Sequence, residues 1–314
     1  MTPIHSSKMT KQPLPTIYPL IDTHTHFDAP IFDDDREILA QQAQKQGVRH
    51  LVLVGYLYQH FERMYETERS LNKLSLPTPV NVDSQSVSHF SSHVAVGLHP
   101  FYITQHTDNH LMAMAQRIAD QRPLAIGEIG LDTFTEAMKA PDIFAKQVRF
   151  FKAQLDMAVT HQLPVMLHIR KAHAEALAIL KTHDYDAHKL GGIAHSFSGG
   201  TQEAKAFVKL GFKLGVTGQI TNPNAKKLRR AIQAAVDSYG VECLVIETDC
   251  PDMTPIMCQT SDCHSAVHNR NVPANLRWVL LSLSELLNVP PTSLAKQLWH
   301  NSCNALQKNW VYPL

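Results

Sequence analysis

Short apolar runs that stop at a histidine, glutamate or aspartate recur along the whole chain. Five of them are 93-HVAVGLHP-100, 124-LAIGEIGLD-132, 163-LPVMLHIR-170, 192-GIAHSFSG-199 and 243-CLVIETDCP-251. Near-continuous apolar runs of this length are typical of parallel strands that are covered on both faces. The carboxyl ends of such strands meet on one side of the sheet. The pattern therefore predicts one sheet with polar, metal-binding side chains gathered along one edge.

The number and spacing of the strand-like runs predict a particular fold. Strands are expected near 18–22, 49–54, 93–97, 124–128, 164–168, 192–195, 212–216 and 243–248. Most intervals between them are long enough for a helix. Residues 144–162 illustrate this, because Phe144, Val148, Phe151, Leu155 and Ala158 recur at helical spacing. Eight such strand and helix units predict an α/β fold, the (β/α)8 TIM barrel, with the metal-binding residues at the C-terminal ends of its strands.

The first strand-like run leads into His24 and His26. Two side chains at i and i+2 of an extended segment project to the same side, so both imidazoles can bind one ion. In a barrel of this kind, the other strand-end residues would join them on the same face. Metal-dependent hydrolysis is therefore the first functional hypothesis.

Length, charge and cysteine content restrict the alternatives. With 314 residues, 44% of them hydrophobic, the chain can form one barrel domain, expected over residues 16–314 after a flexible leader at 1–15. The net charge of +1 provides no general attraction to nucleic acid, so a phosphate must be bound locally.

The leader has no apolar stretch typical of a signal peptide or membrane anchor. The five cysteines are odd in number and lie late in the chain, which argues against a secreted disulfide framework and favours a reducing, cytoplasmic location.

The chain resembles the TatD family of metal-dependent nucleases, which belongs to the amidohydrolase-like TIM barrels. The resemblance spans residues 18–306 and rests on the order and spacing of six motifs. They are DTHTHFD (22–28), GLHP (97–100), AIGEIGLD (125–132), LPVMLHIRKA (163–172), HSFSG (195–199) and ETDCP (247–251).

This resemblance implies two divalent ions per subunit, Zn²⁺, Mn²⁺ or Mg²⁺. One ion would be bound by His24, His26, Glu128 and Asp249, with Glu128 bridging to a second ion bound by His168 and His195. The implied activity is the 3′-5′ exonucleolytic cleavage of DNA, and potentially RNA, at single-stranded or frayed 3′ ends. No obligate protein partner is evident, and a monomer is expected.

The chemistry of phosphodiester hydrolysis suggests roles for individual residues. The nucleophile would be a metal-activated water, with Asp249 as its general base and Glu128 fixing the metal spacing. His99 and Arg170 are the candidates for contacts to phosphate oxygens. For Arg170 the alternative is a structural ion pair at the barrel rim, and for His99 it is a buried imidazole without contact to substrate.

Three further features are weaker indications. The basic segment 226-KKLRR-230 could steer a nucleic acid, although it also reads as the solvated face of a helix whose apolar side carries Leu228, Ile232 and Val236. Phe101, Tyr102 and Phe197 could stack on bases or be packed. Cys258, Cys263, His264 and His268 could form a separate zinc site or belong to a polar loop.

Two other functional classes remain open. A hydrolase of small amides, esters or lactones would use the same pair of ions, because the loops around a barrel choose the substrate. Arg170, His99 and the 226–230 segment favour a phosphate chain over a neutral acyl group. A non-catalytic binding protein is disfavoured, because all six expected metal ligands and a candidate base are present.

Overall fold

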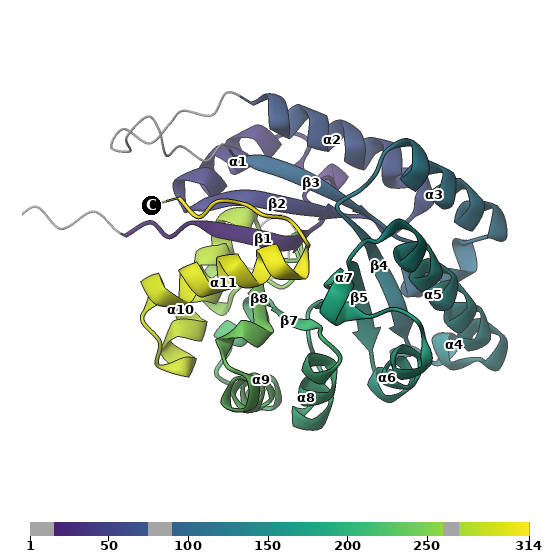
Figure 1. Cartoon of the computed structure of the whole chain (residues 1–314). Coiled ribbons are helices and arrows are strands. Elements are labelled where there is room, and N and C mark those ends of the chain that lie inside the picture. The colour runs from purple at the N-terminus through teal and green to yellow at the C-terminus, as the bar shows by residue number, and fades with distance from the viewer. Residues whose placement is uncertain (1–15, 75–89, 260–269, 314) are drawn as a thin grey trace, which may run out of the picture.

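A computed structural model describes residues 16–74, 90–259 and 270–313. Eight strands lie in the order β1 to β8, and each strand pairs in parallel with the next (Figure 1). This arrangement confirms the predicted (β/α)8 barrel. The strands are β1 (Leu20–Thr25), β2 (Val48–Val54), β3 (Ser91–Val96), β4 (Ala125–Asp132), β5 (Val165–Arg170), β6 (Ile193–Ala194), β7 (Lys213–Val216) and β8 (Leu244–Ile246).

The seam between β1 and β8 is closed by individual hydrogen bonds. The Thr23 hydroxyl donates to the Ile246 carbonyl at 3.1 Å, and the Asp249 backbone N–H donates to the His24 carbonyl at 2.9 Å. The buried Asp22 carboxylate accepts hydrogen bonds from the backbone N–H and hydroxyl of Thr248, at 2.8 and 2.5 Å. These bonds join the first and last strands and bring His24 beside Asp249.

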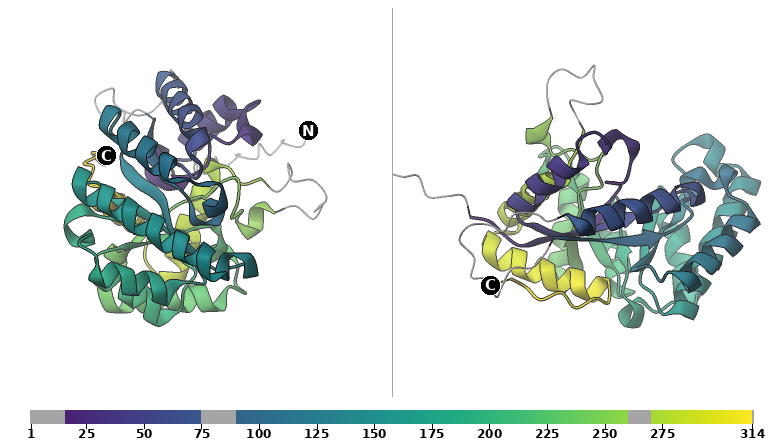
Figure 2. Two further views of the ribbon diagram at one scale, coloured as in Figure 1. Left: turned by 90° about the vertical axis from the view of Figure 1, so that its right-hand side faces the viewer. Right: turned by 90° about the horizontal axis from the view of Figure 1, so that it is seen from above.

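Helices pack around the outside of the strands, as the views in Figure 2 show. They are α1 (Arg36–Lys45), α2 (Phe61–Lys73), α3 (Asp108–Asp120), α4 (Glu136–Lys139), α5 (Pro141–His161), α6 (His173–Thr182), α7 (Ala187–Leu190), α8 (Thr201–Lys209), α9 (Lys226–Tyr239), α10 (Leu276–Leu287) and α11 (Pro291–Ala305). Short 3-10 turns follow several strands, among them η3 (Pro100–Gln105) and η4 (Gly218–Thr221).

The apolar stripes predicted for two helices are the faces that pack on the barrel. In α5, Phe151, Leu155 and Ala158 are buried, while Phe144 and Val148 are partly buried against the same core. In α9, Leu228 and Ile232 are buried and Val236 packs against the core. Helical periodicity therefore located both contact faces correctly.

The barrel interior has its own apolar core, distinct from the layer between strands and helices. Alternate strand residues such as Ile21, Val52 and Val245 point into it, together with Trp299 of α11 and Trp310. Figure 1 shows α11 next to α10 and β1, where it packs against the end of the barrel from which the strands start. Apolar packing thus fills most of this end, whereas the six expected metal ligands lie at the other.

Each predicted strand overlaps an observed one, but the boundaries of all eight differ from the prediction by one to four residues. β1 runs on to Thr25, and β4 continues for four residues beyond Glu128 to Asp132, so some metal-binding residues lie within strands rather than after them. The predicted leader at 1–15 lies outside the described residues. Among the described helices, none combines the length and apolarity that crossing a membrane requires.

Candidate metal centre

The six residues expected to bind metal converge at the carboxyl end of the barrel, although they are spread over most of the chain. The residues from the first strand are His24 within β1 and His26 directly after it. The others are Glu128 in β4, His168 in β5, His195 after β6 and Asp249 after β8. The six side chains belong to three overlapping groups. Within each group, the atoms that could bind a metal lie within 4.8 Å of one another.

The carboxylate of Glu128 stands between two sets of imidazoles. Its Oε2 atom lies 3.4 Å from His24 Nε2 and 3.6 Å from His26 Nε2. Its Oε1 atom lies 2.8 Å from His168 Nδ1 and 3.5 Å from His195 Nε2. The two oxygens therefore face different sets of histidines, as those of a carboxylate that bridges two ions must.

Around Glu128 Oε2 and Asp249 Oδ1, the spacing of the ligand atoms fits metal ligation better than direct hydrogen bonding, whereas His168 Nδ1 lies at hydrogen-bond distance from Glu128 Oε1, at 2.8 Å. Ligand atoms about 2.1 Å from one ion at tetrahedral angles lie about 3.4 Å apart. Around Glu128 Oε2 and Asp249 Oδ1, the distances to the Nε2 atoms of His24 and His26 run from 3.4 to 3.8 Å. Most hydrogen bonds to nitrogen are shorter than these distances.

His24 provides an independent reason to expect an ion. Its ring is fully buried, and neither ring nitrogen has a hydrogen-bond partner within the described parts of the chain. Burying a polar atom without a partner is unfavourable. A bond from Nε2 to a divalent cation would satisfy that nitrogen, so the residues present fit a metal ion.

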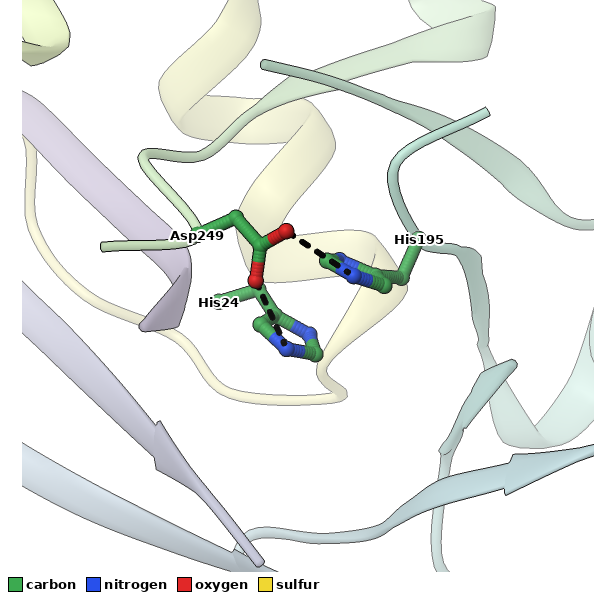
Figure 3. A group of neighbouring side chains, drawn as sticks. All are labelled: His24, His195 and Asp249. Atoms are coloured by element: carbon green, nitrogen blue, oxygen red, sulfur yellow. Dashed lines mark ion pairs between the residues drawn. The ribbon is translucent and has the colours of Figure 1, made fainter. Parts of the chain in front are cut away.

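Asp249 faces both sets of histidines at once. Figure 3 shows one carboxylate oxygen directed at His24 and the other at His195. The corresponding distances are 3.7 Å from Oδ1 to His24 Nε2 and 3.7 Å from Oδ2 to His195 Nε2. Asp249 can thus bind an ion through Oδ1, while Oδ2 points toward His195 and takes no part in that bond.

Three histidines are oriented by partners on the side away from the centre. His195 Nδ1 lies 2.9 Å from Glu247 Oε1, and His168 Nε2 lies 2.9 Å from Asp132 Oδ2. His26 Nδ1 lies 2.9 Å from the Val54 carbonyl. Partners of this kind fix the ring of a ligating histidine and increase its basicity.

Sequence reasoning gave no role to Glu247 or Asp132, although both lie inside quoted motifs. Glu247 precedes Asp249 by two residues, and Asp132 follows Glu128 by four on the same strand. Even spacing along a strand places side chains on the same face. That spacing is the signal that could have assigned both carboxylates to the surroundings of the centre.

Buried charges shift the pKa values of the centre. Burial opposes ionisation of Glu128, yet His99, His195 and His24 hold the pKa of its carboxyl well below the usual range. Burial alone would lower the pKa of His195, but Glu247, Asp249 and Glu128 raise it to about 10. Carboxylates thus dominate the local potential and favour a cation.

The environment of His99 makes it a hydrogen-bond donor to the pocket. Its Nδ1 atom accepts the Phe101 backbone N–H at 3.0 Å, and burial lowers its pKa to about 4. A neutral imidazole that accepts at Nδ1 carries its proton on Nε2. That nitrogen lies 3.2 Å from Glu128 Oε1, so a proton points toward the centre rather than a ligating lone pair.

Arg170 is exposed at the end of β5 and lies flat against an aromatic ring. Its guanidinium carbon is 3.5 Å from the centroid of the Phe134 ring. Within the described chain Arg170 forms no ion pair, so the alternative of a structural ion pair at the rim is not found. Its charge contributes to lowering the pKa of the Asp132 carboxyl, but no described carboxylate pairs with the guanidinium directly, so the guanidinium can bind an anionic ligand.

Two buried glutamines of α5 connect the helix to loops beside the centre. Gln154 Oε1 accepts the Leu98 backbone N–H at 2.7 Å, next to His99. Gln147 Oε1 accepts the Asp132 backbone N–H at 2.8 Å, and Gln147 Nε2 donates to the carbonyl of the same residue. Both amides are polar residues on an otherwise apolar helix face, a signal that the sequence contained.

An open pocket of about 450 Å³ lies over the centre. Both predicted substrate contacts, His99 and Arg170, line it together with five of the six expected metal ligands, and only His24 lies beneath its surface. Phe101 and Tyr102 also line the pocket, whereas Phe197 is buried against His173 and Phe207. Stacking on bases is thus ruled out for Phe197 by its burial.

The remaining predicted features have different outcomes. Lys226, Lys227 and Arg230 are exposed on the first turns of α9, as the solvated-face interpretation requires. Of the four residues considered for a separate zinc site, Cys263, His264 and His268 lie outside the described residues. Cys258, the fourth, lies 3.5 Å from Asn275 Oδ1.

Comparisons with known proteins agree with this centre. A family model described as TatD related DNase matches residues 21–307. The chain is 33% identical over 285 residues to YjjV of Escherichia coli (strain K12), named as an uncharacterized metal-dependent hydrolase, covering 90% of this chain and 95% of YjjV. The crystal structure of YjjV matches with a TM-score of 0.75 at 30% identity, covering 92% of this chain and 98% of that one.

A further relative carries a more specific name. The chain is 30% identical over 207 residues to the 3′-5′ ssDNA/RNA exonuclease TatD of Pantoea sp. (strain At-9b), covering 66% of this chain and 74% of that protein. Together with the barrel and its converging imidazoles and carboxylates, these relatives define a metal-dependent hydrolase. The chain belongs to the family of TatD-related DNases.

Proposed function

We propose that this protein is a metal-dependent 3′-5′ exonuclease that cleaves single-stranded DNA, or frayed 3′ ends of a duplex, and can accept RNA. One observation carries the choice of a phosphodiester. Arg170 presents an exposed guanidinium without a carboxylate partner in the described chain, on the same pocket as the candidate metal centre. A planar cation of this kind suits two phosphate oxygens. The exonuclease named among the relatives supports the same substrate class.

We assign the ligands of two divalent ions as follows. His24, His26, Asp249 and Glu128 Oε2 would bind one ion, and His168, His195 and Glu128 Oε1 would bind the other. Mixed imidazole and carboxylate ligands suit Zn²⁺ or Mn²⁺ and tolerate Mg²⁺. When bound, such ions acidify a water molecule and neutralise charge on the phosphoryl group.

The protein's own side chains would supply the remaining steps. Asp249 Oδ2 would accept the proton of the attacking water, because the ligand role uses only Oδ1. Arg170 and the Nε2–H group of His99 would donate hydrogen bonds to phosphate oxygens and orient the scissile bond. Glu247 and Asp132 would hold the rings of His195 and His168 in place.

The test is digestion of a 5′-labelled single-stranded DNA by protein loaded with Mg²⁺, Mn²⁺ or Zn²⁺. We expect a ladder that shortens from the 3′ end and disappears after treatment with EDTA. The Asp249→Asn variant should lose at least about a hundredfold in rate, the usual contribution of a general base. Asp237→Asn, at an exposed position on α9, is the matched control and should cleave normally.

Two results would count against this proposal. No cleavage with any of the three ions, combined with hydrolysis of a lactone or an ester, would assign the centre to small-molecule chemistry. Near-normal cleavage by Asp249→Asn would remove that carboxylate from the role of base.

A further inference from the structure

One wall of the pocket over the metal centre consists of aromatic rings. Tyr56 follows β2, and Phe101 and Tyr102 belong to η3, the turn that begins directly after His99. The ring centroids of Tyr56 and Tyr102 are 5.5 Å apart with planes inclined at 41°, and those of Phe101 and Tyr102 are 5.3 Å apart and nearly perpendicular. The three rings thus form one continuous surface.

The three rings are more exposed to solvent than is expected for aromatic side chains that only pack in the protein core. The Phe101 side chain, which has no polar atom, is 37% exposed, and Tyr56 and Tyr102 are half-buried. Neither tyrosine hydroxyl forms a hydrogen bond to any described residue. Hydrogen bonding within the protein therefore does not explain the position of these two rings. Exposed aromatic carbon beside a reaction centre favours a flat apolar ligand group.

The distance from the wall to the centre corresponds to a single nucleotide. The Tyr102 ring centroid lies 5.7 Å from that of His99, whose Nε2 is 3.2 Å from Glu128 Oε1. In a nucleotide, one sugar separates the base from its phosphate. A phosphate held by His99 and Arg170 would therefore place the attached base near these rings.

We propose that Tyr56, Phe101 and Tyr102 form a stacking site for the base of the 3′-terminal nucleotide. This inference rests on the proposed exonuclease function and narrows its substrate to 3′ ends that carry an intact base. Stacking on an aromatic side chain strengthens binding about fivefold to a hundredfold per base and tolerates every base, because each has a flat π face. The site would thus bind the terminal nucleotide without selecting a sequence.

The experiment compares two 5′-labelled oligonucleotides that differ only at the 3′ end. One ends in thymidine and the other in an abasic tetrahydrofuran residue, and both are digested by the metal-loaded wild-type protein. We expect a KM at least about fivefold higher for the abasic end. In Tyr102→Ala the KM for the thymidine end should rise to the abasic value, so that the difference disappears. Tyr102→Phe, which keeps the ring, should keep the difference.

A binding measurement avoids dependence on turnover. In the Asp249→Asn background, the fluorescence of 2-aminopurine at the 3′ end should be quenched on binding, and adding Tyr102→Ala should relieve the quenching. Phe101→Ala provides a second variant if Tyr102→Ala does not fold, as judged by circular dichroism and metal content. Tyr239→Ala is the matched control, because Tyr239 is an exposed tyrosine at the last residue of α9 and is not among the residues that line the pocket.

The outcomes separate the two proposals. Equal KM values for the two oligonucleotides, or quenching that survives both alanine variants, would reject the stacking site and leave the exonuclease intact. Failure of the wild-type protein to cleave either oligonucleotide with any ion would reject the exonuclease and the stacking site together.

Discussion

Glu247 shows how a single buried carboxylate can govern the candidate centre without binding a metal itself. Its side chain is fully buried, and Oε1 accepts the Ser196 backbone N–H at 2.6 Å while lying 2.9 Å from His195 Nδ1. Gly215 on the neighbouring strand makes room for it, because a Cβ atom there would lie 2.4 Å from the same oxygen. A close approach of this kind explains why glycine occupies that position.

The first prediction concerns Glu247→Gln. The variant keeps the size of the side chain but removes the charge that fixes the His195 ring, so metal affinity should fall about tenfold to a hundredfold. Metal titration of the apo-protein by calorimetry measures this change. Glu242→Gln, a glutamate five residues earlier and outside the centre, is the control. Unchanged affinity in Glu247→Gln would show that His195 needs no such support.

The Arg170→Ala variant tests the expected contact between Arg170 and phosphate. Removing a charged hydrogen-bond donor to phosphate should raise the KM for single-stranded DNA about tenfold, with a smaller effect on kcat. Lys181→Ala removes an exposed charge from α6 and should leave KM unchanged. If KM stays constant in Arg170→Ala, the stacking of the guanidinium on Phe134 is structural.

At the scale of elements, helix α5 does more than cover the barrel. Its apolar residues pack against the strands, while Gln147 and Gln154 hold the backbone beside Asp132 and His99 through buried hydrogen bonds. Helical periodicity predicted the packing face. It could not predict which backbone groups the glutamines would contact, because these belong to separate elements: Asp132 is the last residue of β4, and Leu98 follows β3.

The exposed cations of helix α9 are expected to contribute to nucleic-acid binding. Its first turns expose Lys226, Lys227 and Arg230, and the turn before it, η4, includes Gln219 of the pocket wall. Replacing the three cations with alanine should flatten the dependence of log KM on log salt by about 0.7 for each phosphate that the protein no longer neutralises. The measurement is KM for single-stranded DNA from low to moderate salt. An unaltered slope would assign these residues to solvation alone.

At the scale of the whole molecule, the two ends of the barrel differ in their chemistry. The carboxyl end concentrates the imidazoles and carboxylates, while α11 and Trp310 close the other end. Within that closed end, His50 Nδ1 lies 2.8 Å from the Ser91 hydroxyl, which lies 3.1 Å from His93 Nε2. Burial lowers the pKa of His50 to about 3 and that of His93 to about 4.

These lowered pKa values predict how stability depends on pH. In the unfolded chain both histidines take up protons below about pH 6.5, whereas the folded protein resists protonation until about pH 4 or lower. Their contribution is therefore complete above about pH 6.5 and is lost as the pH falls toward 4. Each histidine can add up to about 1.4 kcal/mol per pH unit to the decline in the free energy of unfolding.

Urea unfolding between pH 7 and 5 tests this dependence. The His50→Asn variant should show a shallower loss of the free energy of unfolding than the wild type, because one titrating group is gone. His300→Asn, an exposed histidine of α11, should retain the wild-type slope. Equal slopes in His50→Asn and the wild type would mean that other groups control the decline.

The fold class and the residue types of the centre follow from the amino-acid sequence alone. Eight apolar runs with helical segments between them specify the barrel, because side chains buried on both faces leave a visible pattern. His24 and His26 were placed by the period of an extended strand, and the remaining residues by the order of the family motifs.

Which atoms face one another depends on the tertiary structure. The two oxygens of Glu128 face different sets of histidines, Glu247 supports His195, and three aromatic rings form one pocket wall. These relations join residues from different strands and loops. The periodicity of a strand determines on which face of the sheet a side chain lies. Closure of the barrel determines which other side chains it contacts on that face.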